Sequence, residues 1–340
     1  MTEQHQYDVE SIFALGRKVT ENVSRVFVGK PSTLELLICA LLAEGHILLE
    51  DVPGVGKTLL ARSLARSVGG TFKRLQFTPD LLPADVTGFN VYDRQSGQFK
   101  FLAGPVMANI LLADEINRAI PRTQSSLLES MEEGQVTVDG KTLTLPRPFL
   151  VIATQNPVEL EGTFPLPEAQ LDRFLLRLKM GYPSPEEEIT ILERFQQDDP
   201  LAGLQPVITT AQVTALQQVR REIAVAAPVK EYIVNLTRAT REFPLLRFGA
   251  SPRASLHLMR AAQALAALRG RRYVLPDDVK YLAQPVLAHR LSIEAKDMVR
   301  GVTAENALQE IISGVPVPAP LSQGDDHASK TGRAADTVQQ

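Results

Sequence analysis

The chain has 340 residues, of which 44% are hydrophobic and 22% are charged, and its formal net charge is −3. This length allows two domains, because single hydrophobic cores stop growing at roughly 250–300 residues. The slightly negative charge provides no general attraction to nucleic-acid phosphates. The single cysteine, Cys39, excludes an intrachain disulfide, and we expect it to be a buried thiol in a reducing compartment.

The first residues contain neither the basic nor the apolar region of a signal peptide. No apolar run reaches the roughly 18 residues that are needed to span a bilayer. The five histidines are scattered without the spacing of metal ligands, and one cysteine cannot complete a zinc site. We therefore expect a cytoplasmic protein without a membrane span or a zinc site.

Helices alternate with short apolar runs over the first half of the chain. Two helices are predicted over 9–27 and 32–45, with Ser32 and Glu35 forming a capping box at the start of the second. Predicted strands follow at 46–50, 72–77, 109–114, 148–154 and 174–180. Because these runs lack strict alternation and are separated by helical segments, they predict a parallel sheet that is covered on both faces. The predicted fold class is therefore α/β.

Two segments interrupt this alternation and predict β-hairpins. Residues 78–104 are rich in turn-forming residues and contain a hairpin candidate around Ser96-Gly97. In the second segment, 134–147, Asp139-Gly140 lies between two β-branched runs, which is a strong hairpin signal. We interpret both segments as insertions into the α/β domain.

The character of the chain changes after residue 182. The first domain is predicted over 1–182, and helical patterns joined by short loops predict a helical domain over 183–313. Residues 314–340 lack large apolar periodicity and are rich in proline, serine, glycine and charge. This composition predicts a disordered tail.

A phosphate-binding loop is indicated by the stretch HILLEDVPGVGKTLLARSLA at 46–65. Its small residues allow backbone N–H groups to approach phosphates, while a lysine and a hydroxyl serve the phosphates and Mg²⁺. These residues are Gly54, Gly56, Lys57 and Thr58. The strict pattern G-x-x-x-x-G-K-[ST] requires glycine at position 51, where this chain has Asp51. On the loop alone, a strand-to-helix turn with an incidental lysine remains the alternative.

Polar side chains follow two other predicted strands. Asp114 and Glu115 end one strand, and ATP hydrolysis needs one carboxylate near Mg²⁺ and another that activates water. Asn156 follows the next strand, where an amide can hold the attacking water. The alternatives are a solvated acidic strand end and a polar turn before Pro157.

Two arginines are candidates for contact with phosphate. Arg253 lies in the first turn of a helix, where a cation is locally unfavourable, so we expect it to reach another group such as a γ-phosphate. Arg173 lies at a helix end before a strand. By itself, Arg173 fits a surface salt bridge better than a contact with phosphate.

Five segments in this order resemble the MoxR family of AAA+ ATPases over about residues 8–312. They read GHILLEDVPGVGKT, LQFTPDLLPADVTG, LLADEINRAIPRTQSSLLESMEEGQVTV, VIATQNPVELEGTFPLPEAQLDRF and GASPRAS. The resemblance implies an AAA+ P-loop core with a parallel sheet and two β-containing insertions, followed by a C-terminal all-α lid domain. It also implies ATP and Mg²⁺ as cofactors. Similar loops commonly carry an acidic residue at the position of Asp51, so this departure does not imply an inactive site.

The resemblance assigns a role to each candidate residue. Glu115 matches the catalytic base, Asn156 sensor 1 and Arg253 sensor 2. Arg173 is the best match for an arginine finger that acts on a neighbouring subunit, with Arg118 as a second candidate. Thr58 and Asp114 are the implied Mg²⁺ ligands. The implied nucleotide-binding residues are Val28, Gly29, Pro53, Gly54, Val55, Gly56, Lys57, Thr58, Leu59 and Asp114.

An arginine finger supplied by a neighbour implies a homo-oligomer, which the resemblance makes a hexameric ring. Such a finger can contribute about 10³–10⁵ in rate, so isolated subunits should be nearly inactive. The helical domain carrying Arg253 is expected to rotate as the γ-phosphate appears and leaves. The family resemblance implies a chaperone that remodels or matures a protein client, with a von Willebrand factor A domain protein as its partner.

Three other functions remain open at this point. A metal-chelatase-like ATPase subunit shares the same branch of the superfamily. A nucleic-acid motor is disfavoured by the net charge and by the lack of a helix-turn-helix or zinc module, so nucleic acid is not an expected partner. A nucleotide-gated scaffold without hydrolysis is disfavoured by Glu115, Asn156 and the two arginines.

Overall fold

The computed structural model describes residues 7–156, 162–197 and 199–318. Of the tail predicted over 314–340, the part from residue 319 onward lies outside the described residues. None of the helices within the described ranges is both long enough and apolar enough to cross a bilayer.

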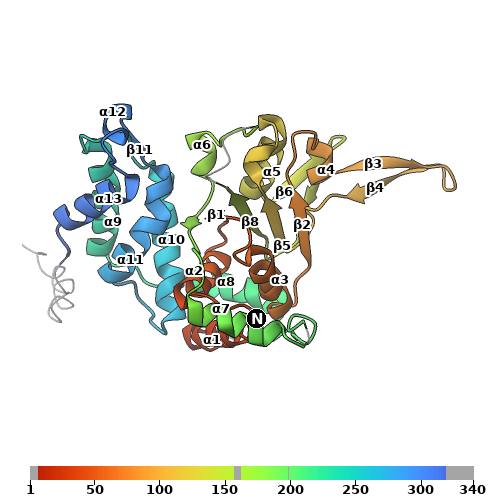
Figure 1. Cartoon of the computed structure of the whole chain (residues 1–340), viewed down its shortest axis with the longest axis horizontal. Coiled ribbons are helices and arrows are strands. Elements are labelled where there is room, and N and C mark those ends of the chain that lie inside the picture. The colour runs from red at the N-terminus through yellow and green to blue at the C-terminus, as the bar shows by residue number, and fades with distance from the viewer. Residues whose placement is uncertain (1–6, 157–161, 198, 319–340) are drawn as a thin grey trace, which may run out of the picture.

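A five-stranded sheet forms the centre of the α/β part (Figure 1). Its strands, in spatial order, are β2 (Phe72–Gln76), β5 (Ile110–Asp114), β8 (Leu150–Gln155), β1 (Ile47–Glu50) and β9 (Leu176–Leu178). Each neighbouring pair is parallel. The five strands and their parallel arrangement are therefore confirmed.

Both faces of the sheet are buried, because successive side chains of a strand point to opposite sides. In β1, Ile47 and Leu49 belong to one core and Leu48 belongs to the other. The first core is shared with α1 (Val9–Ser24), α2 (Pro31–Leu42) and α3 (Lys57–Ser67), and the second with α5 (Pro121–Glu133). This double burial explains the continuous apolar runs in the sequence.

The start of α2 differs from the prediction. The helix begins at Pro31 and its N-cap residue is Lys30, without a side-chain cap. Proline suits the first helical position because its φ is already helical and it has no N–H to satisfy. Ser32 therefore lies inside the helix, and Glu35 instead forms an ion pair with Arg269 at 3.0 Å. The predicted capping box was wrong.

Both predicted hairpins are confirmed. One is formed by β3 (Gly88–Asp93) and β4 (Gln98–Ala103), follows the short helix α4 (Pro83–Thr87), and projects from the body of the molecule (Figure 1). The other is formed by β6 (Gln135–Val138) and β7 (Lys141–Thr144). Its turn residues Asp139 and Gly140 have φ values of 48° and 77°, as a two-residue turn that matches strand twist requires.

The chain after β9 is mostly helical. Its helices are α7 (Pro185–Phe195), α8 (Thr210–Arg220), α9 (Ala227–Glu242), α10 (Pro252–Leu268), α11 (Pro276–Leu287), α12 (Ala295–Met298) and α13 (Ala304–Gly314). The helices from α9 onward stand beside the sheet, on the side opposite the β3–β4 hairpin, whereas α7 and α8 lie near α1 (Figure 1). The antiparallel pair β10 (Leu246–Phe248) and β11 (Ser292–Ile293) adds a small sheet that the all-α prediction did not include.

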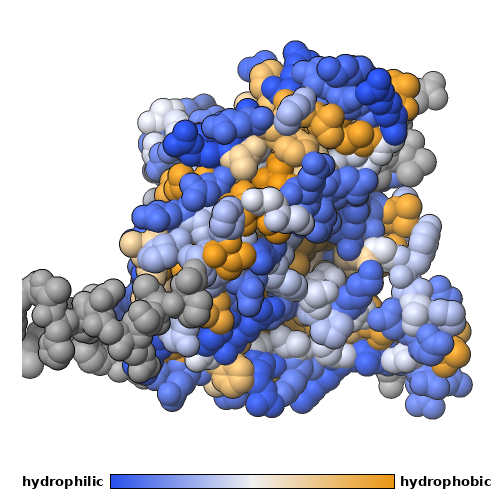
Figure 2. All heavy atoms as spheres, turned by 90° about the vertical axis from the view of Figure 1, so that its left-hand side faces the viewer, coloured by the Kyte–Doolittle hydropathy of each residue, from blue (hydrophilic) through white to orange (hydrophobic). Residues whose placement is uncertain are grey.

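The helical part shares a continuous core with the α/β part. Helix α10 packs on α2, where the buried Cys39 thiol donates a hydrogen bond to the Ala261 carbonyl at 3.3 Å. From α8, Gln217 donates to the Leu41 carbonyl at 2.7 Å. The outer face of the helical part is mostly hydrophilic, with hydrophobic residues in a few patches (Figure 2). The helical part and the sheet are therefore joined through buried side chains, and the rotation of the helical domain with the γ-phosphate stays a prediction.

Candidate functional site

The phosphate-binding loop connects β1 to α3. Gly54 and Gly56 have φ values of 89° and 86°, in the left-handed region where a side chain would be strained. The loop leads into the first turn of α3, whose free N–H groups favour an anion. Lys57 Nζ donates to the Asp51 carbonyl at 2.9 Å. Burial lowers the pKa of Lys57, and the nearby carboxylates of Asp51, Asp114 and Glu115 oppose this shift.

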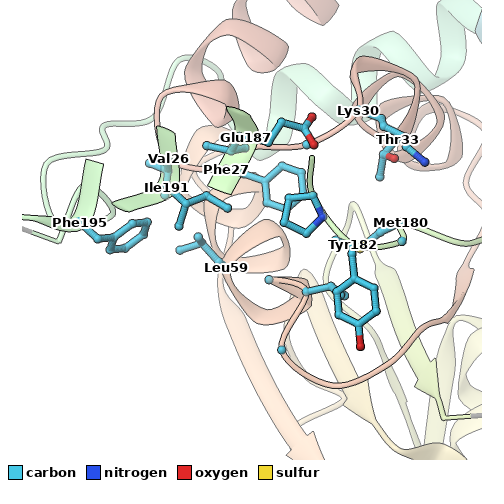
Figure 3. A pocket seen from close by; sticks show the side chains of 17 residues that line it. Val26, Phe27, Lys30, Thr33, Leu59, Met180, Tyr182, Glu187, Ile191 and Phe195 are labelled. Atoms are coloured by element: carbon cyan, nitrogen blue, oxygen red, sulfur yellow. The ribbon is translucent and has the colours of Figure 1, made fainter. Parts of the chain in front are cut away.

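A cavity of about 350 Å³ lies beside the loop. Figure 3 shows Phe27, Leu59 and Tyr182 around it, from the segment between α1 and α2, from α3 and from the segment that joins β9 to α7. Of the predicted nucleotide-binding residues, those that line it are Val28, Gly29, Gly54, Val55, Gly56 and Leu59. Pro53 is exposed and does not line it. An apolar cavity that opens onto a phosphate-binding loop suits a nucleoside joined to phosphates.

The sequence analysis did not predict that Phe27 and residues 180–183 line this cavity. No motif marks these residues, because they reach the cavity only after β9 has joined the edge of the sheet next to β1. An aromatic residue directly before the predicted Val28 was the one available signal.

Asp51 has a structural role that its motif position did not suggest. Its buried carboxylate accepts hydrogen bonds from the Met180 N–H at 2.5 Å and from the Gly181 N–H at 2.9 Å. It therefore joins the base of the phosphate-binding loop to a segment that lines the cavity. Glycine, which the strict pattern requires, has no side chain with which to make this connection.

The two acidic residues at the end of β5, Asp114 and Glu115, are held by a third residue, Thr154 of β8. The Thr154 hydroxyl donates to Asp114 Oδ1 at 2.6 Å and accepts from the Glu115 N–H at 2.8 Å. Thr154 is buried, and it serves both acids across adjacent strands. Glu115 itself has φ 55° and ψ 50°, a left-handed conformation that costs free energy in a non-glycine residue and that is often found at active sites. The sequence placed Thr154 at this strand end but predicted no role for it.

Side chains of the edge strand β2 also contact the acids. Arg74 donates two hydrogen bonds to Asp114 Oδ2, at 2.6 and 3.1 Å. Gln76 donates to Glu115 Oε2 at 2.7 Å. Both residues were missed, although their spacing of two places them on one face of this strand, next to the predicted acidic strand end.

The oxygen atoms of Thr58 and Asp114 fit Mg²⁺, which takes few protein ligands and completes its shell with water and phosphate oxygens. Among the described residues, no group of three or more His, Cys, Asp or Glu side chains could hold a metal ion by itself. Asn156 directly follows β8, the strand between β1 and β5, and is buried. The predicted phosphate-side residues thus meet at one edge of the sheet, where the parallel strands end.

Arg173 and Arg253 lie elsewhere and share one partner. Arg173 Nε is 3.1 Å from Glu132 Oε2, and Arg253 forms a salt bridge with the other oxygen of the same carboxylate. These three residues line a cavity of about 270 Å³ together with His46, at the amino end of β1. The four residues of β1, at about 3.3 Å each, put roughly 13 Å between this end and the phosphate-binding loop.

The structure therefore does not bring Arg253 to the phosphate-binding loop of its own chain, as a lid that responds to its own γ-phosphate would require. Helix α10, which carries Arg253, is packed on α2 instead of over the loop. Arg118 differs from both arginines, because its Nε is 3.0 Å from Glu115 Oε2, at the carboxyl ends of the strands where the phosphate-binding loop lies. A finger for a neighbouring subunit must point away from its own site, so this geometry favours Arg173 over Arg118.

Comparisons with known proteins agree with this arrangement. Residues 46–176 match the family model "ATPase family associated with various cellular activities (AAA)", and residues 238–311 match "AAA lid domain". The chain is 52% identical to the uncharacterized protein YeaC of Bacillus subtilis, an alignment that covers 92% of this chain and 98% of that protein. It is 44% identical to the chaperone MoxR1 of Mycobacterium tuberculosis, over 90% of this chain and 83% of the relative.

A solved structure extends the similarity to the whole fold. The crystal structure of a protein from Cytophaga hutchinsonii matches with a TM-score of 0.86 and 36% identity, over 92% of this chain and 97% of that one. The resemblance in sequence, the phosphate-binding loop with its two acids and the matched lid lead to the same assignment. This chain is an ATPase that belongs to the MoxR family of AAA+ proteins.

Proposed function

We propose that this ATPase works as a homo-hexameric ring in which each nucleotide is completed by the neighbouring subunit, and that it remodels or matures a protein client. The observation that carries the proposal is the placement of Arg173 and Arg253. Both lie at the amino ends of the parallel strands, opposite the ends that lead to the phosphate-binding loop, and both pair with Glu132. Two cations that cannot reach their own nucleotide are suited to reach that of an adjacent copy.

In the proposed site, the backbone N–H groups of the loop and Lys57 hold the phosphates, while the apolar cavity takes the nucleoside. Thr58 and Asp114 would hold Mg²⁺, which neutralises charge on the phosphates. Glu115 accepts a proton from the attacking water, and Asn156 orients that water. Thr154 keeps both acids in place through its two hydrogen bonds.

The client assignment is supported by an apolar surface and by a relative. On the β3–β4 hairpin, Phe89, Tyr92 and Leu102 are exposed, and Phe99 is 73% exposed. An apolar group on a projecting hairpin suits contact with another protein. The similar M. tuberculosis protein is named a chaperone. A von Willebrand factor A domain protein as the partner is part of the proposal and rests on the family resemblance.

Mixed rings test the trans assignment. Arg173→Ala keeps a nucleotide site but lacks the finger, and Lys57→Ala keeps the finger but lacks the lysine for phosphate. Each protein alone should show little steady-state ATP hydrolysis, and mixing them should restore activity. Glu115→Gln should bind ATP without turnover. Arg238→Ala, at an exposed arginine that pairs with Glu242 one turn further along the same helix, is the control and should match the unmodified protein.

The same mixture distinguishes the two finger candidates. Arg118→Ala should not be rescued by Lys57→Ala, because Arg118 contacts Glu115 of its own chain. Rescue of Arg118→Ala together with no rescue of Arg173→Ala at any ratio would show that the finger is misassigned. A client role would be tested by capture on the ATP-bound Glu115→Gln ring, with Phe99→Asp as the variant that should reduce capture.

A further inference from the structure

A buried arginine of the helical part contacts the segment that carries Arg173. Arg290 lies in the short 3-10 helix η2 (Ala288–Arg290) after α11, and its side chain is only 2% exposed. Its Nε donates to Asp172 Oδ1 at 2.7 Å. Its Nη2 donates to the carbonyl of Asp172 at 3.2 Å and to the carbonyl of Phe174 at 2.5 Å. The guanidinium thus spans the backbone on both sides of Arg173.

The remaining nitrogen of Arg290 also has partners, because Nη1 donates to the Val286 carbonyl and lies 2.8 Å from His289 Nε2. Nη2 has a third neighbour, His257 Nδ1 at 2.5 Å, so its two N–H groups are shared among three acceptors. Burial, and then the charge of Arg290, lower the pKa of His257 to about 3, so this imidazole is neutral and can accept. Burial lowers the pKa of Arg290 to about 10 while Asp172 opposes the shift, so Arg290 remains a cation at neutral pH.

Asp172 extends this contact to Arg253. Its second oxygen, Oδ2, accepts from the Ser251 hydroxyl at 2.9 Å. Ser251 is the N-cap residue of α10, and Arg253 follows two residues later in the first turn. One carboxylate therefore holds both the segment of Arg173 and the start of the helix with Arg253. The side chains of these two arginines converge on Glu132.

We propose that Arg290, acting through Asp172, is a positioning residue that sets Arg173 and Arg253 in the geometry in which they meet the neighbouring subunit's nucleotide. This inference rests on the proposed function, in which both arginines act in trans. The fork of a guanidinium is needed, because a lysine ammonium is a point charge that cannot span Asp172 and two backbone carbonyls. A displacement of about 1 Å can cost 10²-fold in rate, so the effect on catalysis should be large.

The test uses the mixed rings, in which the Lys57→Ala subunit donates the finger and the Arg173→Ala subunit accepts it, and adds Arg290→Lys to one of the two. When the donor subunit carries Arg290→Lys, the restored ATP hydrolysis should fall by about 10-fold or more. When the acceptor carries it (Arg173→Ala with Arg290→Lys), activity should stay within about 2-fold, because the finger of that subunit is already absent. A purely structural role would reduce both mixtures equally.

Arg220→Lys in the donor is the matched control. Arg220 is another buried arginine that joins the helical part to the α/β part, through the Leu42 carbonyl and Glu44, but it makes no contact with the finger segment. It should leave the restored activity within about 2-fold. If Arg290→Lys does not fold, Ser251→Ala removes only the hydrogen bond to Asp172 and should show the same donor-side loss, to a smaller degree.

Equal loss in both mixtures, or loss in neither, would overturn the positioning role while leaving the trans finger intact. A failure of the parent mixture of Lys57→Ala and Arg173→Ala would instead overturn the trans assignment, and the inference with it. Size-exclusion chromatography of each mixture shows whether rings have formed, so that a loss of assembly is recognised as a structural effect and counts against the proposal.

Discussion

Replacement of Asp51 by glycine would restore the strict phosphate-loop pattern and, on the present structure, damage the protein. The Asp51 carboxylate accepts the N–H groups of Met180 and Gly181, and the residue is 6% exposed. If Asp51 were only a tolerated variation of the loop, Asp51→Gly would be neutral or beneficial. If the carboxylate holds the segment that lines the cavity, the variant should lose both stability and nucleotide affinity.

The size of the effect follows from the two hydrogen bonds. A hydrogen bond to a charged group contributes about 1.5–3 kcal/mol, and removing the acceptor leaves the N–H of the buried Met180 without it, whereas Gly181 is exposed to water. We expect Asp51→Gly to lower the free energy of unfolding by about 3 kcal/mol, at the lower end of this range for two bonds. Asp51→Asn keeps one acceptor oxygen and should lose about half as much. The released segment lines the cavity, so the Kd for ATP should rise by about 10-fold, or about 1.4 kcal/mol.

Urea denaturation and titration with a fluorescent ATP analogue measure these quantities. Asp80→Gly, at an exposed turn position, controls for the general cost of introducing glycine. The expected order of stability is wild type, then Asp51→Asn, then Asp51→Gly. An Asp51→Gly protein within about 0.5 kcal/mol of wild type, the usual range for surface substitutions, with an unchanged Kd would refute the structural role of the carboxylate.

Two further predictions concern buried polar groups. Burial lowers the pKa of His46 to about 4, so between pH 6.5 and 4 the unfolded chain binds a proton that the folded one does not. As the pH is lowered over this range, the free energy of unfolding should fall by about 3 kcal/mol more than in His46→Asn. Equal pH dependence of the two proteins in urea denaturation would contradict this. Thr154→Val removes the hydroxyl shared by Asp114 and Glu115 and should lower steady-state ATP hydrolysis by about 10-fold or more with ATP binding retained. Thr154→Ser should remain near wild type, and an equal loss in both variants would show that the methyl group matters instead.

Much of the fold could be predicted because its signals are local. The strands are continuous apolar runs that the two-sided core requires, and Asp139-Gly140 specifies its hairpin turn through backbone conformation alone. The start of α2 shows the limit of this approach. Ser32 and Glu35 satisfied a local capping pattern, but Pro31 starts the helix one residue earlier.

The candidate nucleotide site likewise contains residues that local motifs predict and residues that only long-range contacts bring in. The loop residues from Gly54 to Thr58, the acids Asp114 and Glu115, and Asn156 could be found because each follows a strand that was itself predictable, and parallel strands end at one edge. The rest of the site depends on long-range pairing. Thr154 reaches the acids only because β8 lies beside β5.

By itself, the sequence determined that this chain is a P-loop ATPase, since the chemistry for phosphate and water lies in short segments whose conformation is set by a few neighbouring residues. Only the tertiary structure decided that Arg173 and Arg253 lie together on Glu132, away from the phosphate-binding loop of their own chain. Arg253 is placed by the packing of α10 on α2, more than 200 residues away in the chain, and Arg173 is held by Arg290 from the helical part. Such contacts depend on which buried surfaces fit together, and no local pattern encodes that choice.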